Sequence, residues 1–331
     1  MSSNIENFVL DTTERLRVLF WARTDFARNI VVETLAHLSE VRVVCVQHFT
    51  EMLAELERID ILVLSDCPVE EARKILSIVN QPGAQLRAVH FITAGRDGFI
   101  AAGGFREDLL VSGPEGAIAP VVAEHAIGLA LAINRQLLPA YDAQRQALWD
   151  RSFIAGTASL EGGTVLIVGA GAIGREVARR ASAFGMRCIA VTRDPKDDKS
   201  FEAVHAISDL PMLLPTADAV VLCIALGPET RHLISWNEFA LCRPSAILVN
   251  VGRGGLVDQD ALEDALRSGR IAGAGLDVTD PEPLPERHSL WSAPNLLITA
   301  HYAGAGSHVG ERRIADSVVS AVRVASMRAH Q

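Results

Sequence analysis

Short apolar runs alternate with helical patterns in the first third of the chain. Two segments, FARNIVVETLAHLSE (26–40) and VEEARKILSIVN (69–80), carry apolar residues at intervals of three and four, as amphipathic helices do. Around them lie five runs that are typical of strands: RVLFWA, VRVVCV, DILVLS, LRAVHFITAG and DLLVSG. Strands that alternate with helices predict a parallel sheet.

A second α/β series follows a long apolar segment. The pattern VVAEHAIGLALAINRQLLPAYDAQRQALW (121–149) predicts one long helix whose first half is apolar nearly all round and is therefore buried on several sides, as between domains or subunits. Six near-continuous apolar runs come next, as expected for a parallel sheet covered on both faces: TVLIVGAG, RCIAVT, AVVLCIA, AILVNVG, AGAGLDV and LLITAH. A last amphipathic helix after residue 301 has no sheet of its own and must dock on an element built earlier.

Composition and charge narrow the class of protein. A chain of 331 residues is long enough for about two domains. Apolar residues make up 49% and aromatic residues only 5%, a balance typical of α/β proteins. The net charge of −9 argues against a nucleic-acid partner. The five cysteines have no CxxC spacing, and we expect reduced thiols and no metal site. The N-terminus lacks a signal-peptide pattern and no run approaches the ~18 apolar residues of a membrane span, so we expect a cytoplasmic protein with no membrane partner.

A dinucleotide fingerprint opens the second series. Gly169, Gly171 and Gly174 form G-x-G-x-x-G directly after the run TVLIV and at the start of a helical pattern. These glycines allow a tight turn, close approach of the backbone to a pyrophosphate and close packing of helix on strand. We expect this turn, including Ala172 and Ile173, to bind the cofactor at the helix N-terminus.

The end of the next strand decides between the two nicotinamide cofactors. An acidic residue there would hydrogen-bond the ribose 2′-OH of NAD. In RCIAVTRDP the place is held by Thr192 and Arg193, which suit the 2′-phosphate of NADP. A shift of two residues in register would put Asp194 there instead. We therefore expect NADP as the preferred cofactor and keep NAD as the alternative.

Three further segments, ILVNVGRGGLVDQDAL, GAGLDVTDPEPLP and NLLITAHYAGAG, carry a family resemblance. With the fingerprint, they make the chain from about Val111 onward resemble the D-isomer-specific 2-hydroxyacid dehydrogenase family, which includes glyoxylate/hydroxypyruvate reductases and phosphoglycerate dehydrogenases. The resemblance implies that Arg253, Glu282 and His301 form the catalytic set. One departure is Ala300, where the family usually has proline, so a looser turn before the histidine is expected.

The chemistry of 2-oxo acid reduction fits these three residue types. His301 titrates in the right pH range to give a proton to the carbonyl oxygen. Glu282 favours the charged imidazole and orients it. Arg253 offers a planar fork to the carboxylate and carbonyl oxygen of the substrate. The glutamate partner argues against a formate dehydrogenase. Each residue alone also has a purely structural interpretation, as a loop arginine, a turn glutamate or a capping histidine.

The resemblance also implies further contacts. Asp277 is expected near the nicotinamide carboxamide, with a turn or cap aspartate as the alternative. The backbone around Ala225 and Leu226, together with Val251, is expected beside the cofactor. In the first α/β series, the loop of Ala94, Gly95 and Arg96 is expected to bind the substrate carboxylate through its N–H groups. The arginine either adds a charge to the pocket or faces solvent.

The resemblance also implies that the substrate domain comes first in the chain, which explains why the glycine fingerprint lies halfway along the sequence. We expect a flavodoxin-like substrate domain of residues 1–120 and 303–331 and a Rossmann dinucleotide-binding domain of residues 121–302, both with parallel sheets. The apolar helix from Val121 to Leu138 predicts a homodimer, because an exposed apolar face of that size would be a liability. The leading hypothesis is an NADPH-dependent reductase of small 2-oxo acids. The alternative is a dinucleotide-sensing regulatory protein of the same fold.

Overall fold

The computed structural model describes residues 15–23, 25–114 and 116–328, which divide into two compact units. One unit holds the described residues up to Ala117 and those from Glu311 onward, and the other runs from Ile118 to Gly310. The sequence-based boundaries are 120/121 and 302/303, whereas this division falls at 117/118 and 310/311. The roles assigned to the two parts stay predictions.

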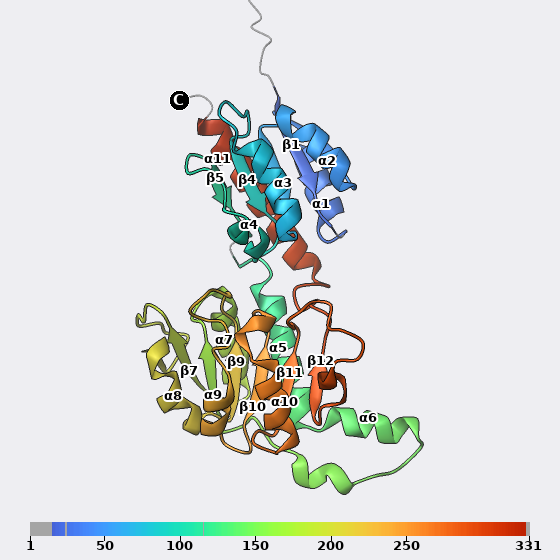
Figure 1. Ribbon diagram of the computed structural model, residues 1–331, viewed down its shortest axis with the longest axis vertical. Helices are drawn as coiled ribbons and strands as arrows, with labels where there is room; N and C mark the ends of the chain where they lie inside the picture. Colours follow the sequence, from blue (N-terminus) through green and yellow to red (C-terminus); the bar gives the residue numbers. More distant parts are fainter. Residues whose placement is uncertain (1–14, 24, 115, 329–331) are drawn as a thin grey trace, which may run out of the picture. The chain divides into compact units, whose positions relative to one another are not determined.

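The first unit is built on a parallel sheet of order β2-β1-β3-β4-β5, the flavodoxin-like order. Figure 1 labels its strands β1, β4 and β5. All five predicted strands are present: β1 (Leu16–Trp21), β2 (Val41–Val46), β3 (Ile61–Leu64), β4 (Ala88–Phe91) and β5 (Leu110–Ser112). The helices that follow them are α1 (Arg28–Ala36), α2 (Phe49–Glu55), α3 (Val69–Val79) and α4 (Asp97–Ala101). β3 and β4 are buried along their whole length, because helices cover both faces of the sheet.

The C-terminal helix α11 (His308–Arg328) docks on this sheet from Glu311 onward. The buried His90 of β4 ties it in place, since its Nδ1 lies 2.8 Å from Ser112 Oγ and its Nε2 lies 3.0 Å from Ser317 Oγ of α11. Burial lowers the pKa of His90 to about 4, so the ring is neutral near pH 7.

The second unit holds a seven-stranded parallel sheet of order β12-β11-β10-β9-β6-β7-β8. The strand order reverses between β6 and β9, as in Rossmann folds, which confirms the predicted fold class. Its strands are β6 (Thr164–Val168), β7 (Arg187–Thr192), β8 (Ala203–Ala206), β9 (Ala219–Leu222), β10 (Ile247–Asn250), β11 (Gly273–Leu276) and β12 (Leu296–Ile298). Its helices are α5 (Ala119–Asn134), α6 (Leu137–Arg145), α7 (Ala172–Ala183), α8 (Leu210–Leu213), α9 (Trp236–Leu241) and α10 (Gln259–Arg267).

The prediction of one long helix over 121–149 is wrong, because the chain forms α5 and α6 with a break between them. Gln136 at the break has a left-handed backbone, φ 52°. Pro139 accounts for it: a continuous helix would need the missing N–H of Pro139 to bond the carbonyl of Arg135. In α6 the proline is the third residue, where an N–H has no helical partner.

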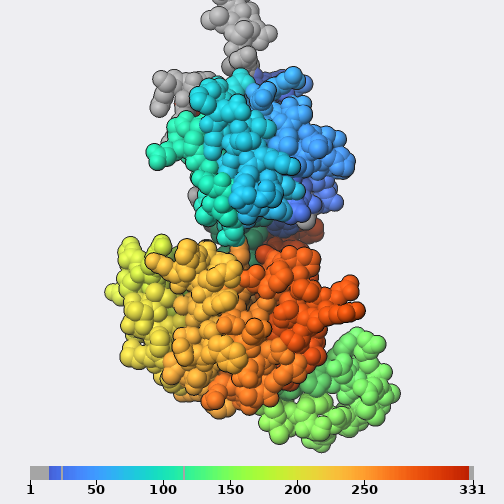
Figure 2. Space-filling view, viewed as in Figure 1, coloured from blue at the N-terminus to red at the C-terminus, as the bar shows by residue number. Residues whose placement is uncertain are grey.

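The apolar surface also lies later in the chain than expected. Most apolar side chains of α5 are buried inside its own unit, where the helix packs against α7, β10 and β11. Five of the exposed large apolar side chains lie instead in an arm of residues 137–156, which extends from the sheet in Figure 1 and forms a separate lobe in Figure 2. They are Leu137, Tyr141, Leu148, Trp149 and Ile154, with Trp149 95% exposed. In the part of the chain that is described, no helix has the length and apolar character needed to cross a bilayer.

Candidate active site

The predicted site residues of the second unit gather at the carboxyl ends of its strands, where open α/β sheets bind ligands. Gly169 directly follows β6, Thr192 ends β7, Ala225 follows β9, Val251 and Arg253 follow β10, Asp277 follows β11, and His301 follows β12. The roles of these residues in binding and catalysis stay predictions, but the topology brings them to one edge.

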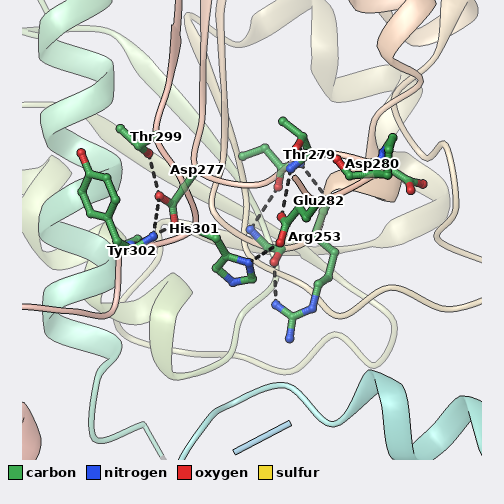
Figure 3. A network of polar contacts seen from close by, with 12 residues as sticks. Arg253, Asp277, Thr279, Asp280, Glu282, Thr299, His301 and Tyr302 are labelled. Atoms are coloured by element: carbon green, nitrogen blue, oxygen red, sulfur yellow. Dashed lines mark hydrogen bonds and ion pairs between the residues drawn. The ribbon is translucent and has the colours of Figure 1, made fainter. Parts of the chain in front are cut away.

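His301 and Glu282 form an ion pair at this edge (Figure 3). His301 Nδ1 lies 2.7 Å from Glu282 Oε2, and the second carboxylate oxygen accepts a 3.1 Å hydrogen bond from Thr279 N. The histidine and glutamate side chains are 50% and 38% exposed. The imidazole therefore has a fixed orientation and still meets solvent, as a proton donor to a bound substrate requires.

The pair shifts both pKa values in opposite directions. The hydrogen bond that His301 donates to Glu282 raises the pKa of His301 above its usual value; burial opposes this, and the carboxylate charge of Glu282 adds to it. Burial raises the pKa of Glu282, but the hydrogen bond and charge of His301, the hydrogen bond from Thr279 N and the charge of Arg253 together leave it below its usual value. Near neutral pH this arrangement favours an imidazolium beside a carboxylate.

We expect Glu282→Gln to move the pH dependence of 2-oxo acid reduction to lower pH. In the expected mechanism the reaction needs protonated His301, so its rate is full below the histidine pKa and falls as the pH rises through it. Removal of the carboxylate removes the interaction that raises this pKa. At a pH above the His301 pKa of both proteins, each unit by which the pKa is lowered reduces the protonated fraction, and with it the rate, about tenfold. The measurement is the pH profile of kcat/KM for the wild type and the variant.

A matched control is Glu263→Gln, which removes another hydrogen-bonded carboxylate of the same unit, on α10. Its pH profile should equal that of the wild type. A descending limb that stays in place in Glu282→Gln would contradict the role of the pair.

The loop that carries Arg253 is held by the buried side chain of Asn250 at the end of β10. Asn250 Oδ1 accepts from Gly252 N at 3.0 Å and Asn250 Nδ2 donates to Arg253 O at 2.9 Å. A Cβ on Gly254 would lie 2.0 Å from Thr279 O, so the glycine allows this loop to pack against the segment that holds Glu282. Arg253 lies near enough to the ion pair to lower the pKa of both partners by its charge.

Asp277 organises the turn that presents His301. The carboxylate is buried, and it accepts hydrogen bonds from Tyr302 N at 3.1 Å and Ala303 N at 3.0 Å. Its main-chain oxygen accepts from His301 N at 2.8 Å. These bonds hold His301 at a φ of 52°, without the proline expected at position 300. Both carboxylate oxygens of Asp277 thus accept hydrogen bonds from the chain itself, which agrees with the alternative that Asp277 is a turn aspartate.

Two of the three fingerprint glycines are packed closely against neighbouring atoms, and the third borders open space. A Cβ on Gly174 would lie 1.9 Å from Gly169 O, so this glycine is needed where α7 packs on the turn. Gly169 has a φ of 116°, and its Cβ would lie 3.0 Å from Cys223 O. Gly171 has no atom within 4 Å of its would-be Cβ, and Ala172 begins α7 beside it. Open space at a helix N-terminus fits a dinucleotide pyrophosphate.

We expect Gly171→Val to weaken NADPH binding by at least about tenfold without unfolding the protein. The backbone of Gly171 is extended, with φ −80° and ψ −165°, so valine fits the chain and fills only the open space. Gly174→Ala is the matched variant and should instead lower the melting temperature, because overpacking costs about 1–3 kcal/mol. Fluorescence titration and thermal melting separate the two. Equal affinity of Gly171→Val and wild type would contradict the assignment.

The residues expected to choose the cofactor lie at the end of β7. Thr192 is the last residue of this strand and Arg193 after it is exposed. Asp194, the acidic alternative, points its carboxylate to Lys196 Nζ at 2.7 Å on the surface. Ala225 and Leu226 lie in the loop after β9, where Thr230 Oγ1 donates to Ala225 O at 3.0 Å.

The predicted substrate loop belongs to the other unit. Ala94, Gly95 and Arg96 connect β4 to α4, and Thr93 Oγ1 donates to Gly95 O at 3.2 Å. The exposed guanidinium of Arg96 lies over the ring of Phe91, 5.7 Å from its centroid. Binding of the substrate carboxylate by this loop stays a prediction.

Sequence reasoning missed three polar residues that support the site: His125, Asn250 and Thr299. Asn250 carries a signal, since a lone amide ends an otherwise apolar strand. His125 lies in an apolar helix far from the site in sequence, and only the fold brings it to Thr299. Within the described residues, no cluster of three or more His, Cys, Asp or Glu side chains is placed to hold a metal ion.

Comparisons with known proteins agree with this architecture. Residues 127–303 match the model of the D-isomer specific 2-hydroxyacid dehydrogenase, NAD binding domain. The chain is 33% identical over 274 residues to the hydroxypyruvate reductase of Thermotoga maritima. The match covers 82% of this chain and 86% of that protein. It is 32% identical over 279 residues to the D-3-phosphoglycerate dehydrogenase of Methanocaldococcus jannaschii. This match covers 84% of this chain but only 52% of that protein's length.

A solved structure shows the same likeness. The NADPH-dependent glyoxylate/hydroxypyruvate reductase of Sinorhizobium meliloti, in complex with NADP and malonate, superposes with a TM-score of 0.71 at 30% identity. The match covers 92% of each chain. The similarity therefore extends over both units.

Proposed function

Because the chain belongs to the D-isomer specific 2-hydroxyacid dehydrogenase family, as its motifs predicted, we propose that it reduces small 2-oxo acids such as glyoxylate or hydroxypyruvate to D-2-hydroxy acids with NADPH. The observation that carries this proposal is the His301–Glu282 pair at 2.7 Å, beside Arg253, at the carboxyl edge of a Rossmann sheet. The names of the relatives support the class of substrate.

Each residue has one task in the proposed reaction. The nicotinamide, when bound, supplies the hydride to the carbonyl carbon. His301 gives its proton to the carbonyl oxygen, and Glu282 keeps the ring charged and oriented. The Arg253 guanidinium binds the carboxylate and carbonyl oxygen, and its charge stabilises the oxygen as negative charge develops on it. The fingerprint glycines and the N-terminus of α7 hold the pyrophosphate.

The preference for NADP rests on the end of β7. A strand that ends at Thr192 puts Thr192 and the exposed Arg193 where NAD-binding proteins commonly have an acidic residue. Asp194 lies farther on and pairs with Lys196. A basic and a hydroxyl side chain suit a 2′-phosphate, since arginine binds phosphate through a planar fork.

A homodimer is proposed on different grounds from those of the sequence. Five exposed apolar side chains lie on the arm of residues 137–156, with Trp149 95% exposed and Tyr141 57% exposed. A second copy that covers this arm would remove them from water. Sedimentation velocity at micromolar concentration should show a dimer for the wild type, and a monomer would contradict the proposal.

The test of the function is an absorbance assay of NADPH and, separately, NADH oxidation with glyoxylate, hydroxypyruvate, pyruvate and 3-phosphohydroxypyruvate. Fast oxidation of NADPH with a small unphosphorylated acid is the expected result. A higher kcat/KM with 3-phosphohydroxypyruvate, or with NADH, would overturn the substrate or the cofactor assignment. Tight dinucleotide binding without turnover on any acid would instead favour a sensing protein.

A further inference from the structure

A line of three polar side chains runs from α5 to the turn that carries His301. His125 Nε2 of α5 lies 2.9 Å from Thr299 Oγ1, and Thr299 Oγ1 lies 2.6 Å from Asp277 Oδ1. His125 Nε2 also lies 3.5 Å from the same carboxylate oxygen. All three residues belong to the second unit. The proposed reaction uses neither His125 nor Thr299.

The direction of these hydrogen bonds follows from the protons available. A threonine hydroxyl has one proton, and Thr299 gives it to the Asp277 carboxylate, which cannot donate when ionised. His125 must therefore donate from Nε2 to Thr299 Oγ1. Both the neutral ring protonated at Nε2 and the imidazolium can do this, so the line does not depend on the charge of His125.

The line ends on the group that organises the turn. The Asp277 carboxylate, 2% exposed, must find donors inside the protein. Thr299 Oγ1 supplies one donor, and Tyr302 N and Ala303 N supply the others. Asp277 thus ties together residues before and after His301. The left-handed backbone of His301, φ 52°, is an unfavourable conformation that persists only where the surroundings hold it.

His125 makes a second contact with the same turn. Its ring meets the ring of Tyr302 edge to face, with centroids 5.2 Å apart and an interplanar angle of 76°. The histidine therefore touches Thr299, two residues before His301, and Tyr302, one residue after it. These two contacts hold the turn on both sides of the residue that it presents.

We propose that His125 is a positioning residue, which acts through Thr299 and Asp277 to hold the turn that presents His301. This proposal rests on the proposed function for the part that His301 plays. The turn keeps its shape with alanine at position 300 because side-chain contacts from His125 of α5 and from Asp277, directly after β11, supply the restraint that a proline ring would give.

The test compares His125→Leu, His125→Gln, Thr299→Val and the double variant His125→Leu/Thr299→Val. Leucine removes the donor, whereas the glutamine amide keeps a donor near the place of Nε2. His125→Leu is expected to lower kcat about tenfold, since small misplacements of a catalytic group are costly. Its NADPH affinity and the descending limb of its pH profile should match the wild type, because Glu282 still sets the pKa of His301.

Rescue and coupling separate positioning from a general packing role. His125→Gln should retain kcat within about threefold, and the double variant should be no slower than Thr299→Val alone, because both changes break one line. Wild-type kcat in His125→Leu, equal losses in His125→Leu and His125→Gln, or multiplied losses in the double variant would each overturn the proposal.

A readout without turnover separates this proposal from the proposed function. Hydrogen exchange at the amides of Tyr302 and Ala303, both bonded to Asp277, should become faster in His125→Leu than in the wild type. If the wild type reduces no 2-oxo acid, the proposed function fails while this measurement still tests the positioning. Unchanged exchange at both amides would overturn the positioning role.

Discussion

His301→Ala is expected to lower kcat for 2-oxo acid reduction by about a hundredfold to ten-thousandfold, the range that one general acid contributes. Alanine cannot protonate the carbonyl oxygen, so the hydride transfer would leave an alkoxide that only water could neutralise. His301 is half-exposed, and its imidazole takes no part in the hydrogen bonds that join Asp277 to this turn. The variant should therefore fold and bind NADPH as the wild type does.

Stopped-flow absorbance of NADPH gives kcat, and fluorescence titration gives the affinity for NADPH. The matched control is His205→Ala, which removes a partly exposed histidine from β8 of the same unit. Its kcat should equal that of the wild type. A His301→Ala variant that retains a tenth or more of the activity would assign the proton donor elsewhere.

Arg253→Lys should lower kcat/KM by about a hundredfold to a thousandfold, the usual cost of removing one donor to a developing oxyanion. Lysine keeps the positive charge but not the planar fork that binds two oxygens at once. The fold of the loop should survive, because the side chain of Asn250 bonds main-chain atoms of Gly252 and Arg253, which the substitution leaves in place. The loss should appear in both kcat and KM, since carboxylate and oxyanion share the side chain.

The control for this prediction is Arg243→Lys, an arginine of the same unit that bonds Pro215 O and pairs with Asp218. Steady-state kinetics with the best 2-oxo acid should leave its kcat/KM near the wild-type value. If Arg253→Lys retained kcat/KM within about threefold, the bidentate role would be wrong.

The two sheets could be predicted because their strands are near-continuous apolar runs that end at polar turns. The prediction failed where the signal was short or local. β8 (Ala203–Ala206) contains a polar histidine and only four residues, so its pattern resembles a loop. The break at Gln136 depends on Pro139, a signal present in the sequence but outweighed by the apolar periodicity around it.

The residues of the candidate site could be predicted where they belong to one short sequence motif. The glycines of the fingerprint and the motif around Arg253 each lie in one short segment. Distances between segments are a property of the folded chain: that Glu282 reaches His301 Nδ1 depends on how two loops meet after β11 and β12. The contribution of α5 is harder still to predict from the sequence, since His125 is simply one polar residue in an apolar helix.

The end of β7 has a consequence for how such a protein can diversify. Arg193, Asp194 and Lys196 are all exposed, and the Asp194–Lys196 pair lies on the surface. Substitutions at exposed positions usually change stability by less than about 0.5 kcal/mol. Gly169 and Gly174, in contrast, are confined by neighbouring backbone. If the proposed roles hold, selection can alter which nicotinamide cofactor is preferred in a few mutational steps, while the turn proposed to bind the phosphates shared by both cofactors stays under strong constraint.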